Sequence, residues 1–274
     1  LKLGGFTNGC ELCGEAKETG AAYVAGNSFC LCDECYDKVS ENAAAYTAVD
    51  RAEEDQEAAW RANADSPGVL ARWCAQEKVP LVHYSTDYVF DGQGQRPYRE
   101  DDVTAPLGVY GASKLAGEEA IRAAGGRHLI FRTAWVYASH GQNFLRTMLR
   151  VGAEREELKV VADQIGTPTP AALIADVTAQ AIQHPAELSG TWHLTANGET
   201  SWHGFAAAIF AGAQARGLIA RAPKVLPITT AEYPTKAKRP AYSRLDTGRL
   251  QADLGIVLPD WQEGLARVMD ELAQ

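Results

Sequence analysis

The pattern of apolar and polar positions along the chain predicts a mixed α/β protein. Residues 81–86 and 128–137 form short, largely apolar runs that are typical of strands. Stretches with helical spacing separate these runs, and Gly125-Gly126 and Ser201 have the character of a C-cap and an N-cap. The predicted helices cover 56–76 (interrupted near Pro67-Gly68), 110–124, 143–154, 173–183, 202–216 and 262–272, and further strands cover 158–161 and 190–195.

Composition indicates a soluble protein that can bury a sizeable core. The 274 residues are 46% hydrophobic and 22% charged. No apolar run approaches the roughly 20 residues of a membrane-spanning helix, and the start carries no signal-peptide pattern, so we expect a cytoplasmic location. The first residue is Leu1 rather than Met, and we expect the true N-terminus to lie upstream. The net charge of −9 argues against a nucleic-acid partner.

The most informative residues are a tyrosine and a lysine four positions apart in a predicted helix. Tyr110 and Lys114 would lie on one helix face. A lysine beside a phenol favours the phenolate and lowers the pKa of the tyrosine. Such a tyrosine can give a proton to a carbonyl oxygen while a nicotinamide gives a hydride to its carbon. The pair alone is weak evidence, but the strand at 81–86 delivers Ser85 and Thr86 to a strand end, where sheets of this class present ligands.

With these residues in view, the chain from residue 42 to 274 resembles the dTDP-4-dehydrorhamnose reductases, which are extended short-chain dehydrogenases/reductases. The resemblance covers about 230 of the 274 residues, in order and without large gaps. The resemblance implies an α/β, Rossmann-like fold with a C-terminal substrate-binding region, mainly residues 138–274. The matching stretches are N-A-A-A-Y-T-A-V-D-R-A-E (42–53), H-Y-S-T-D-Y-V-F-D-G (83–92), Y-R-E-D-D (98–102), A-P-L-G-V-Y-G-A-S-K-L-A-G-E (105–118), F-R-T-A-W-V-Y (131–137), G-Q-N-F (141–144), D-Q-I-G-T-P-T-P (163–170) and R-L-D-T-G-R-L (244–250).

The resemblance also implies catalytic roles, residue by residue. Tyr110 would protonate the C4 carbonyl oxygen of a 4-keto sugar, and Lys114 would lower its pKa and hold the nicotinamide ribose of NADPH or NADH. Thr86 would donate a hydrogen bond to the same carbonyl oxygen, which matters most as negative charge develops there. The implied reaction is the reduction of dTDP-4-dehydro-6-deoxy-L-mannose to dTDP-L-rhamnose.

Further residues would bind the two ligands. Thr86 and Asp87 would contact the sugar, and Trp135 would line its pocket. Taken alone, Trp135 reads more simply as a core residue and Asp87 as a cap or turn residue, so the joint order of the motifs carries these assignments. The cofactor would pass along Ala45, Tyr46 and Thr47.

The first 41 residues do not match the family. A member should begin with a strand and a Gly-x-x-Gly-x-x-Gly turn that holds the cofactor pyrophosphate. Gly4, Gly5 and Gly9 have the wrong spacing and follow no strand. The fold is therefore expected to lack its first β-α units, and the sequence does not decide between NADPH and NADH.

A cysteine-rich segment stands in that place. Cys10, Cys13, Cys32 and Cys35 give two C-x-x-C pairs separated by eighteen residues, a spacing typical of a four-thiolate zinc ribbon or treble clef. The alternatives are two disulfides or reduced thiols, and Cys30 could replace Cys32 as a ligand. Residues 21–29 read as a small hairpin with a Gly-Asn turn, whereas Cys74 falls in a predicted helix and reads as an inert core thiol.

The chain thus reads as a zinc-binding module (1–41) joined without a linker to an N-terminally truncated reductase (42–274). This junction favours a truncated or recombined reading frame, or an assembly artefact, over a natural fusion of whole domains. An exposed edge on the strand at 81–86 would then cause poor solubility or an oligomer such as a homodimer. The function alternative to the reductase is a non-catalytic, zinc-stapled binding protein derived from it.

A basic stretch near the C-terminus is the candidate site for the diphosphate of a nucleotide sugar. It contains Lys236, Lys238, Arg239 and Arg244 within ten residues. A solvated basic loop is an equally good interpretation on charge alone. The family usually has Asn where this chain has Tyr242, which puts that contact in question.

Overall fold

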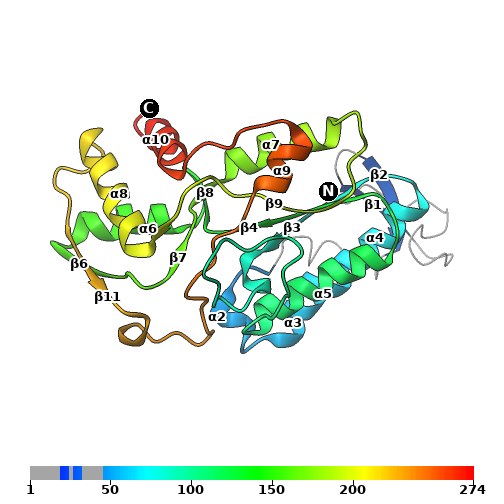
Figure 1. Ribbon diagram of the computed structural model, residues 1–274, viewed down its shortest axis with the longest axis horizontal. Coiled ribbons are helices and arrows are strands. Elements are labelled where there is room, and N and C mark those ends of the chain that lie inside the picture. The colour runs from blue at the N-terminus through cyan, green and yellow to red at the C-terminus, as the bar shows by residue number, and fades with distance from the viewer. Residues whose placement is uncertain (1–18, 25–26, 33–45) are drawn as a thin grey trace. The chain divides into compact units, whose positions relative to one another are not determined.

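The computed structural model describes residues 19–24, 27–32 and 46–274, and the contacts divide the chain into two compact units. Beyond residue 46, the first unit contains residues 46–83 and 108–128, and the second contains 84–107 and 129–274. Figure 1 shows the elements in chain order by colour.

A two-stranded hairpin is described near the N-terminus. Strand β1 (Thr19–Val24) pairs antiparallel with β2 (Asn27–Cys32), with Val24 opposite Asn27. This confirms the hairpin predicted there, while its turn at 25–26 lies outside the described residues. The proposed zinc ligands Cys10, Cys13 and Cys35 also lie outside them, so the metal site stays a prediction.

The first unit consists mainly of helices. They are α2 (Val49–Ala52), α3 (Gln56–Trp60), a π-helical turn (Arg61–Asp65), α4 (Ser66–Gln76) and α5 (Val109–Ala123). The α3, π-helical and α4 segments follow one another without a break, and α3 and α4 both pack against α5 (Figure 1). The predicted interruption near Pro67-Gly68 is wrong. Pro67 is the second residue of α4, directly after the π-helical turn, and the backbone stays helical through both segments.

Close packing between α5 and the π-helical turn depends on one glycine. A Cβ at Gly117 would collide with the backbone carbonyl oxygen of Asn63. Helix α5 ends before Gly125, which has a left-handed φ of 73° and serves as the C-cap predicted from the sequence. The position of α5 is therefore fixed by small residues, and its face with Tyr110 and Lys114 is fixed with it.

A parallel sheet crosses the second unit. Strand β3 (Leu81–Thr86) runs from the first unit into the second at Tyr84, and the strand order is β3-β4-β9. Strand β4 (His128–Thr133) pairs in parallel with β9 (Gly190–His193). The middle of β4 is fully buried, as expected for a parallel strand covered on both faces.

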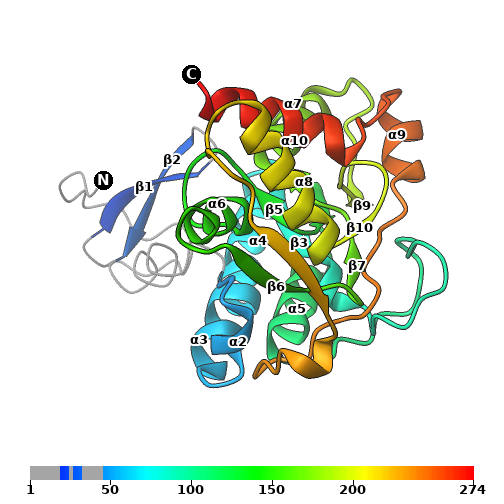
Figure 2. The same ribbon diagram turned by 90° about the vertical axis from the view of Figure 1, so that its left-hand side faces the viewer.

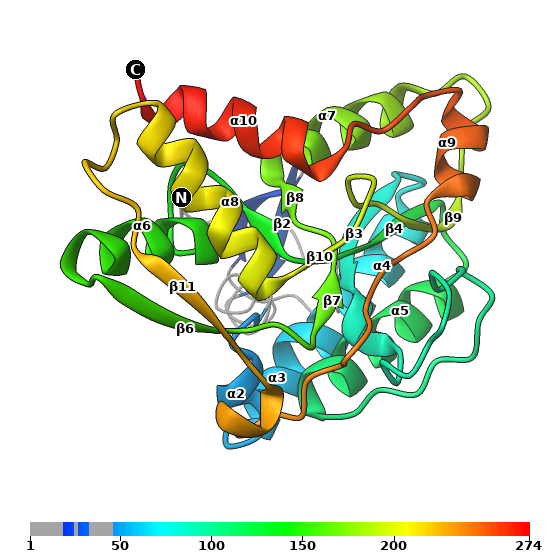
Figure 3. The ribbon, with the colours of Figure 1, turned by 60° about the vertical axis from the view of Figure 1, so that its left-hand side comes forward.

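The strand predicted for 128–137 ends early because of one residue. Trp135 has a φ of 49°, and this left-handed conformation separates β4 from β5 (Val136–Tyr137). Beyond it, three short pairings form in the second unit. They join β5 to β8 (Thr169–Pro170), β7 (Ile165–Gly166) to β10 (Thr200–Ser201), and β6 (Glu157–Val161) to β11 (Lys224–Ile228), the last seen side by side in Figure 3.

Helices supply the main core of the second unit. They are α6 (Phe144–Glu154), α7 (Ala171–Gln183), α8 (Trp202–Ala215), α9 (Gly248–Leu254) and α10 (Trp261–Leu272). Leu145, Phe205, Ile209 and Met269 are fully buried where α6, α8 and α10 meet, and Figure 2 shows α8 beside α10. Two 3₁₀ turns, η2 (Asp87–Val89) and η3 (Thr230–Glu232), complete the elements. None of the helices in the described part of the chain is long and apolar enough to cross a membrane.

Candidate functional site

Helix α5 presents ionisable side chains at every fourth position. The series begins with the half-buried Tyr110 in its first turn and continues with the fully buried Lys114 and Glu118. The carboxylate of Glu53 accepts a hydrogen bond from the backbone N–H of Val109 at 2.8 Å, and so satisfies a free donor at the start of the helix. The helical face predicted for the tyrosine and lysine is therefore present.

The amino group of Lys114 is buried and has a histidine as its neighbour. Its Nζ is 3.2 Å from Nε2 of His83, and the lysine is only 2% exposed. Burial lowers the pKa of Lys114 to about 8, against an opposing effect of the Glu118 carboxylate. Burial, and then the lysine's charge, hold the pKa of His83 well below its ordinary value. Lys114 thus donates to a neutral imidazole, a contact that sequence reasoning missed because the two residues are far apart in the chain.

The segment predicted to follow the cofactor is fixed to α5 through one asparagine. Asn63 accepts a hydrogen bond from the Tyr46 backbone N–H (3.0 Å) and donates to its carbonyl (3.1 Å). The same amide reaches the Ser113 hydroxyl at 3.1 Å. Thr47 is exposed, and Ala45 lies outside the described residues. The sequence did not single out Asn63. It lies in a π-helical turn, a feature that often marks functional positions.

In the second unit, Thr86 and Asp87 form a buried pair at the end of β3. The Thr86 hydroxyl accepts from the Tyr88 backbone N–H at 3.2 Å and donates to Oδ1 of Asp87 at 2.9 Å. Asp87 is 3% exposed. Burial raises its pKa to about 6, and hydrogen bonds from Ser243 and Thr86 partly offset this effect.

Aromatic stacking holds the Trp135 ring in place, and the ring fits there because Gly166 has no side chain. Its ring stacks on Trp202, with centroids 3.6 Å apart and planes 8° from parallel. A Cβ at Gly166 would collide with the Trp135 ring and approach the Ser243 hydroxyl. The tryptophan is half-buried and its left-handed backbone is strained, a combination found at ligand sites more often than in cores.

Two motifs far apart in the sequence meet beside this tryptophan. The backbone N–H of Ser243 donates to the Ile165 carbonyl at 2.8 Å, and the N–H of Tyr242 donates to the Gly92 carbonyl at 3.0 Å. Gly92 has a φ of 70°, and a Cβ there would collide with Pro240. The loop around 163–170 and the loop around 240–244 therefore form one layer of the site.

The basic loop is partly tied to protein groups. Arg244 forms an ion pair with Glu199 at 3.1 Å, and the Tyr242 hydroxyl lies 3.4 Å from the same carboxylate. Arg239 reaches the Tyr88 hydroxyl at 3.4 Å, whereas Lys238 is exposed. The role of this loop in holding a diphosphate stays a prediction.

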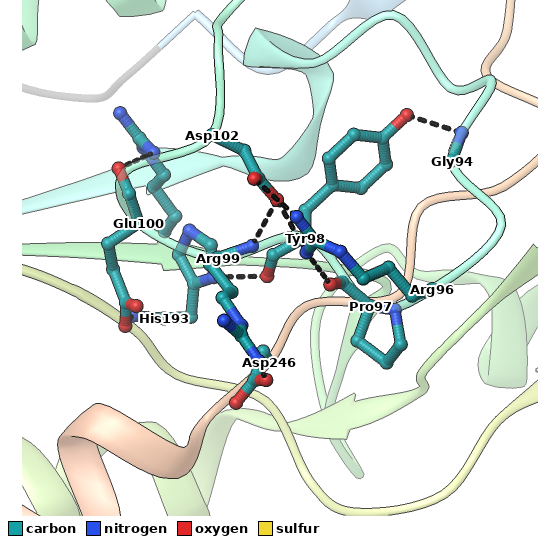
Figure 4. A network of polar contacts seen from close by, with 10 residues as sticks. Gly94, Arg96, Pro97, Tyr98, Arg99, Glu100, Asp102, His193 and Asp246 are labelled. Atoms are coloured by element: carbon teal, nitrogen blue, oxygen red, sulfur yellow. Dashed lines mark hydrogen bonds and ion pairs between the residues drawn. The ribbon is translucent and has the colours of Figure 1, made fainter.

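The Y-R-E-D-D motif forms a polar network (Figure 4). The Tyr98 hydroxyl donates to Asp91 at 2.6 Å, and its ring stacks on Phe90 with centroids 4.4 Å apart. The Glu100 carboxylate accepts from the His193 backbone N–H at 2.9 Å, which fixes the loop to β9. These contacts indicate a structural role for the motif. Among the described residues, no cluster of three or more His, Cys, Asp and Glu side chains could hold a metal ion.

Comparison with known proteins agrees with these features. Residues 30–274 match the family model described as the RmlD substrate binding domain. The dTDP-4-dehydrorhamnose reductase of Escherichia coli K12 is 48% identical over 234 residues, covering 84% of this chain and 78% of the relative. The reductase of the same name from Burkholderia thailandensis is 50% identical over 242 residues, covering 84% and 80%.

Solved structures show the same relationship in three dimensions. The dTDP-4-dehydrorhamnose reductase of Bacillus anthracis, solved in complex with NADP, is 39% identical, with a TM-score of 0.78 over 83% of this chain and 78% of that one. The fold is therefore the mixed α/β, Rossmann-like fold of these reductases. The chain belongs to the RmlD substrate binding domain family, whose curated relatives above are dTDP-4-dehydrorhamnose reductases.

Proposed function

We propose that this chain is a dTDP-4-dehydrorhamnose reductase, which reduces dTDP-4-dehydro-6-deoxy-L-mannose to dTDP-L-rhamnose with NAD(P)H. The observation that carries the proposal is the buried Lys114 one turn after Tyr110 on α5, in a chain 48% identical to a reductase of that name. A structural lysine on a helix surface would keep its ammonium in water, whereas this one is enclosed and has a lowered pKa. Enclosure of that kind is typical of catalytic sites.

The roles of the α5 residues follow from their chemistry. Tyr110 would give its phenolic proton to the carbonyl oxygen, and the positive charge of Lys114 would favour the resulting phenolate. With a pKa of about 8, Lys114 is mostly protonated at neutral pH and retains its hydrogen-bond donors for ribose hydroxyls. A bound reduced nicotinamide would supply the hydride to the carbonyl carbon.

The second unit would bind and polarise the sugar. Thr86 would donate to the carbonyl oxygen, Asp87 would contact the sugar, and Trp135 would form a wall of the pocket. Support comes from the burial of the Thr86–Asp87 pair and from the stacking that fixes the tryptophan ring. Tyr46, held by Asn63, and the neighbouring Ala45 and Thr47 would follow the cofactor.

Turnover with matched variants tests the proposal. Purified chain, NADPH and dTDP-4-dehydrorhamnose should give loss of reduced nicotinamide and formation of dTDP-L-rhamnose. Tyr110→Phe should lower kcat by about 100-fold or more, because it removes the general acid and keeps the ring. Tyr233→Phe, at an exposed tyrosine that directly follows η3, is the control and should retain the wild-type rate. Wild-type chain that consumes no NADPH at saturating substrate would refute the proposal.

We further propose that Cys10, Cys13, Cys32 and Cys35 bind zinc. The support is their spacing and the β1–β2 hairpin that places Cys32 at the end of a strand. Zinc measured by atomic spectroscopy should be present at about one ion per chain, should be lost in Cys13→Ser and should remain in Cys74→Ser, since Cys74 is a buried thiol in α4. A metal-free wild-type chain would contradict this assignment.

We also propose self-association, which light scattering would detect and which a monodisperse monomer would exclude.

A further inference from the structure

The hydroxyl of Thr86 has one hydrogen, and in this structure it is already committed. The oxygen accepts from the Tyr88 N–H, and its hydrogen points to Oδ1 of Asp87. A hydroxyl can accept twice but can donate only once. As long as Asp87 is an anion, which can only accept, Thr86 therefore cannot also donate to a substrate oxygen without giving up its hydrogen bond to the Asp87 carboxylate.

The Asp87 carboxyl lies in surroundings that favour its neutral form. Its Oδ2 is buried and has no hydrogen-bond partner of ordinary geometry among the described residues. A buried, unpaired anionic oxygen is costly, and protonation removes most of that cost. The raised pKa, about 6, follows from the same burial.

We propose that Asp87 sets the direction of the Thr86 hydrogen bond: the neutral carboxyl donates to Thr86 Oγ1 and frees the threonine hydrogen for the substrate's carbonyl oxygen. This inference rests on the proposed function and deepens it. Asp87 acts in this step as a positioning residue for Thr86. One proton from solvent neutralises Asp87 before the reduction, and it stays on the carboxyl throughout.

The charged side chains on the loops packed against Thr86 and Asp87 form hydrogen bonds or ion pairs with other groups. Arg239 contacts the hydroxyl of Tyr88, at the middle of η2. Arg244, next to Ser243, is paired with Glu199, and Asp163 of the neighbouring loop accepts hydrogen bonds from Thr230. Ser243 contributes a hydroxyl that lowers the pKa of Asp87, so it adjusts the pH at which the change occurs.

The test is the pH dependence of the chemical step at saturating NADPH and substrate. For a carboxyl with a pKa of about 6, the neutral fraction, and with it the single-turnover rate, should fall roughly 20-fold between pH 5.5 and 7.5. Asp87→Asn should flatten this fall, since the amide donates to Thr86 at every pH. Thr86→Val should be slower by roughly 100-fold and equally flat. Ser243→Ala should shift the midpoint to higher pH, and Ser243→Thr, which keeps the hydroxyl, should restore it.

A carbon-13 NMR titration tests the pair without turnover. The Asp87 carboxyl and the Thr86 side chain should titrate together with a midpoint near 6, and the Thr86 response should vanish in Asp87→Asn. A pH limb that persists in Asp87→Asn or Thr86→Val, or separate midpoints for the two residues, would overturn the inference. A chain that shows the shared midpoint but reduces no substrate would refute the proposed function and leave the hydrogen-bond coupling supported.

Discussion

The buried position of Asp87 lowers the stability of the folded chain at neutral pH. Its folded-state pKa, about 6, lies above the ordinary aspartate value of 3.8, so the folded chain binds this proton more tightly than the unfolded chain. The associated stability is fully present below about pH 4 and is lost as the pH rises through 6. A difference of about two pKa units corresponds to about 3 kcal/mol.

Asp87→Asn should therefore stabilise the chain at neutral pH. We expect a gain in unfolding free energy of up to about 3 kcal/mol at pH 7.5, with most of it gone near pH 4. Urea unfolding at the two pH values measures this difference. Asp91→Asn is the control, because the Tyr98 hydrogen bond lowers the pKa of that carboxyl and its removal should give no gain. Equal effects of Asp87→Asn at both pH values would contradict the burial argument.

Some site residues could be predicted singly, but their contacts could not. Tyr110 and Lys114 are detectable because helical periodicity places them on one face. The contacts of Lys114 with His83, and of Asp87 with Ser243, join positions that only the tertiary fold brings together. No local sequence pattern indicates these contacts, so no role could be assigned to His83 from the sequence.

At the scale of elements, α5 controls both the position of the proposed catalytic pair, Tyr110 and Lys114, and the charge of its lysine. Glu118, one turn beyond Lys114, raises the lysine's pKa by its negative charge, while burial lowers it. As the pH rises through about 8, Lys114 loses its charge. If Lys114 holds the cofactor ribose as proposed, the KM for NADPH should then rise, because the neutral amine is a weaker hydrogen-bond donor than the ammonium.

Glu118→Gln should shift this transition to lower pH. Removing the carboxylate takes away the effect that opposes burial, so the Lys114 ammonium is lost earlier. Steady-state KM values for NADPH between pH 6 and 9.5 measure the midpoint, with the exposed neighbour Glu119→Gln as control. Identical midpoints in the wild type and Glu118→Gln would show that Lys114 does not govern cofactor binding.

The packing of α5 gives a second prediction at this scale. Gly117→Ala should destabilise the chain by about 2 kcal/mol or more, because the new methyl group meets the rigid backbone carbonyl of Asn63. Gly212→Ala in α8 is the matched control: its methyl finds ordinary contact with Met269, and alanine favours the helix by about 1 kcal/mol. Thermal or urea unfolding of both variants decides the point, and equal losses would contradict it.

Most helices and central strands could be predicted from the sequence, since their apolar periodicity is strong. The exceptions have physical causes. Strand β11 contains Pro227 and, among the described strands, pairs only with β6, so it reads as a loop although a proline is tolerated in an edge strand. The short α9 carries a single buried residue, Leu250, and leaves little periodicity to detect.

At the scale of the molecule, the two units supply different parts of the proposed reaction. Tyr110 and Lys114, the proposed proton donor and ribose ligand, belong to the first unit, and Thr86, Asp87 and Trp135, the proposed sugar contacts, belong to the second. The sequence contains no Gly-x-x-Gly-x-x-Gly turn, and calorimetric titration with NADPH measures how tightly these residues bind the cofactor.

The most direct test of the proposed reductase is the transfer of deuterium from the cofactor. NADPH deuterated at C4 of the nicotinamide is incubated with the chain and dTDP-4-dehydrorhamnose, and the sugar product is analysed by NMR and mass spectrometry. We predict deuterium at C4 of dTDP-L-rhamnose, formed by the wild type and lost with Tyr110→Phe. Product without deuterium at C4, or no product at saturating cofactor, would contradict the assignment of this chain as a reductase.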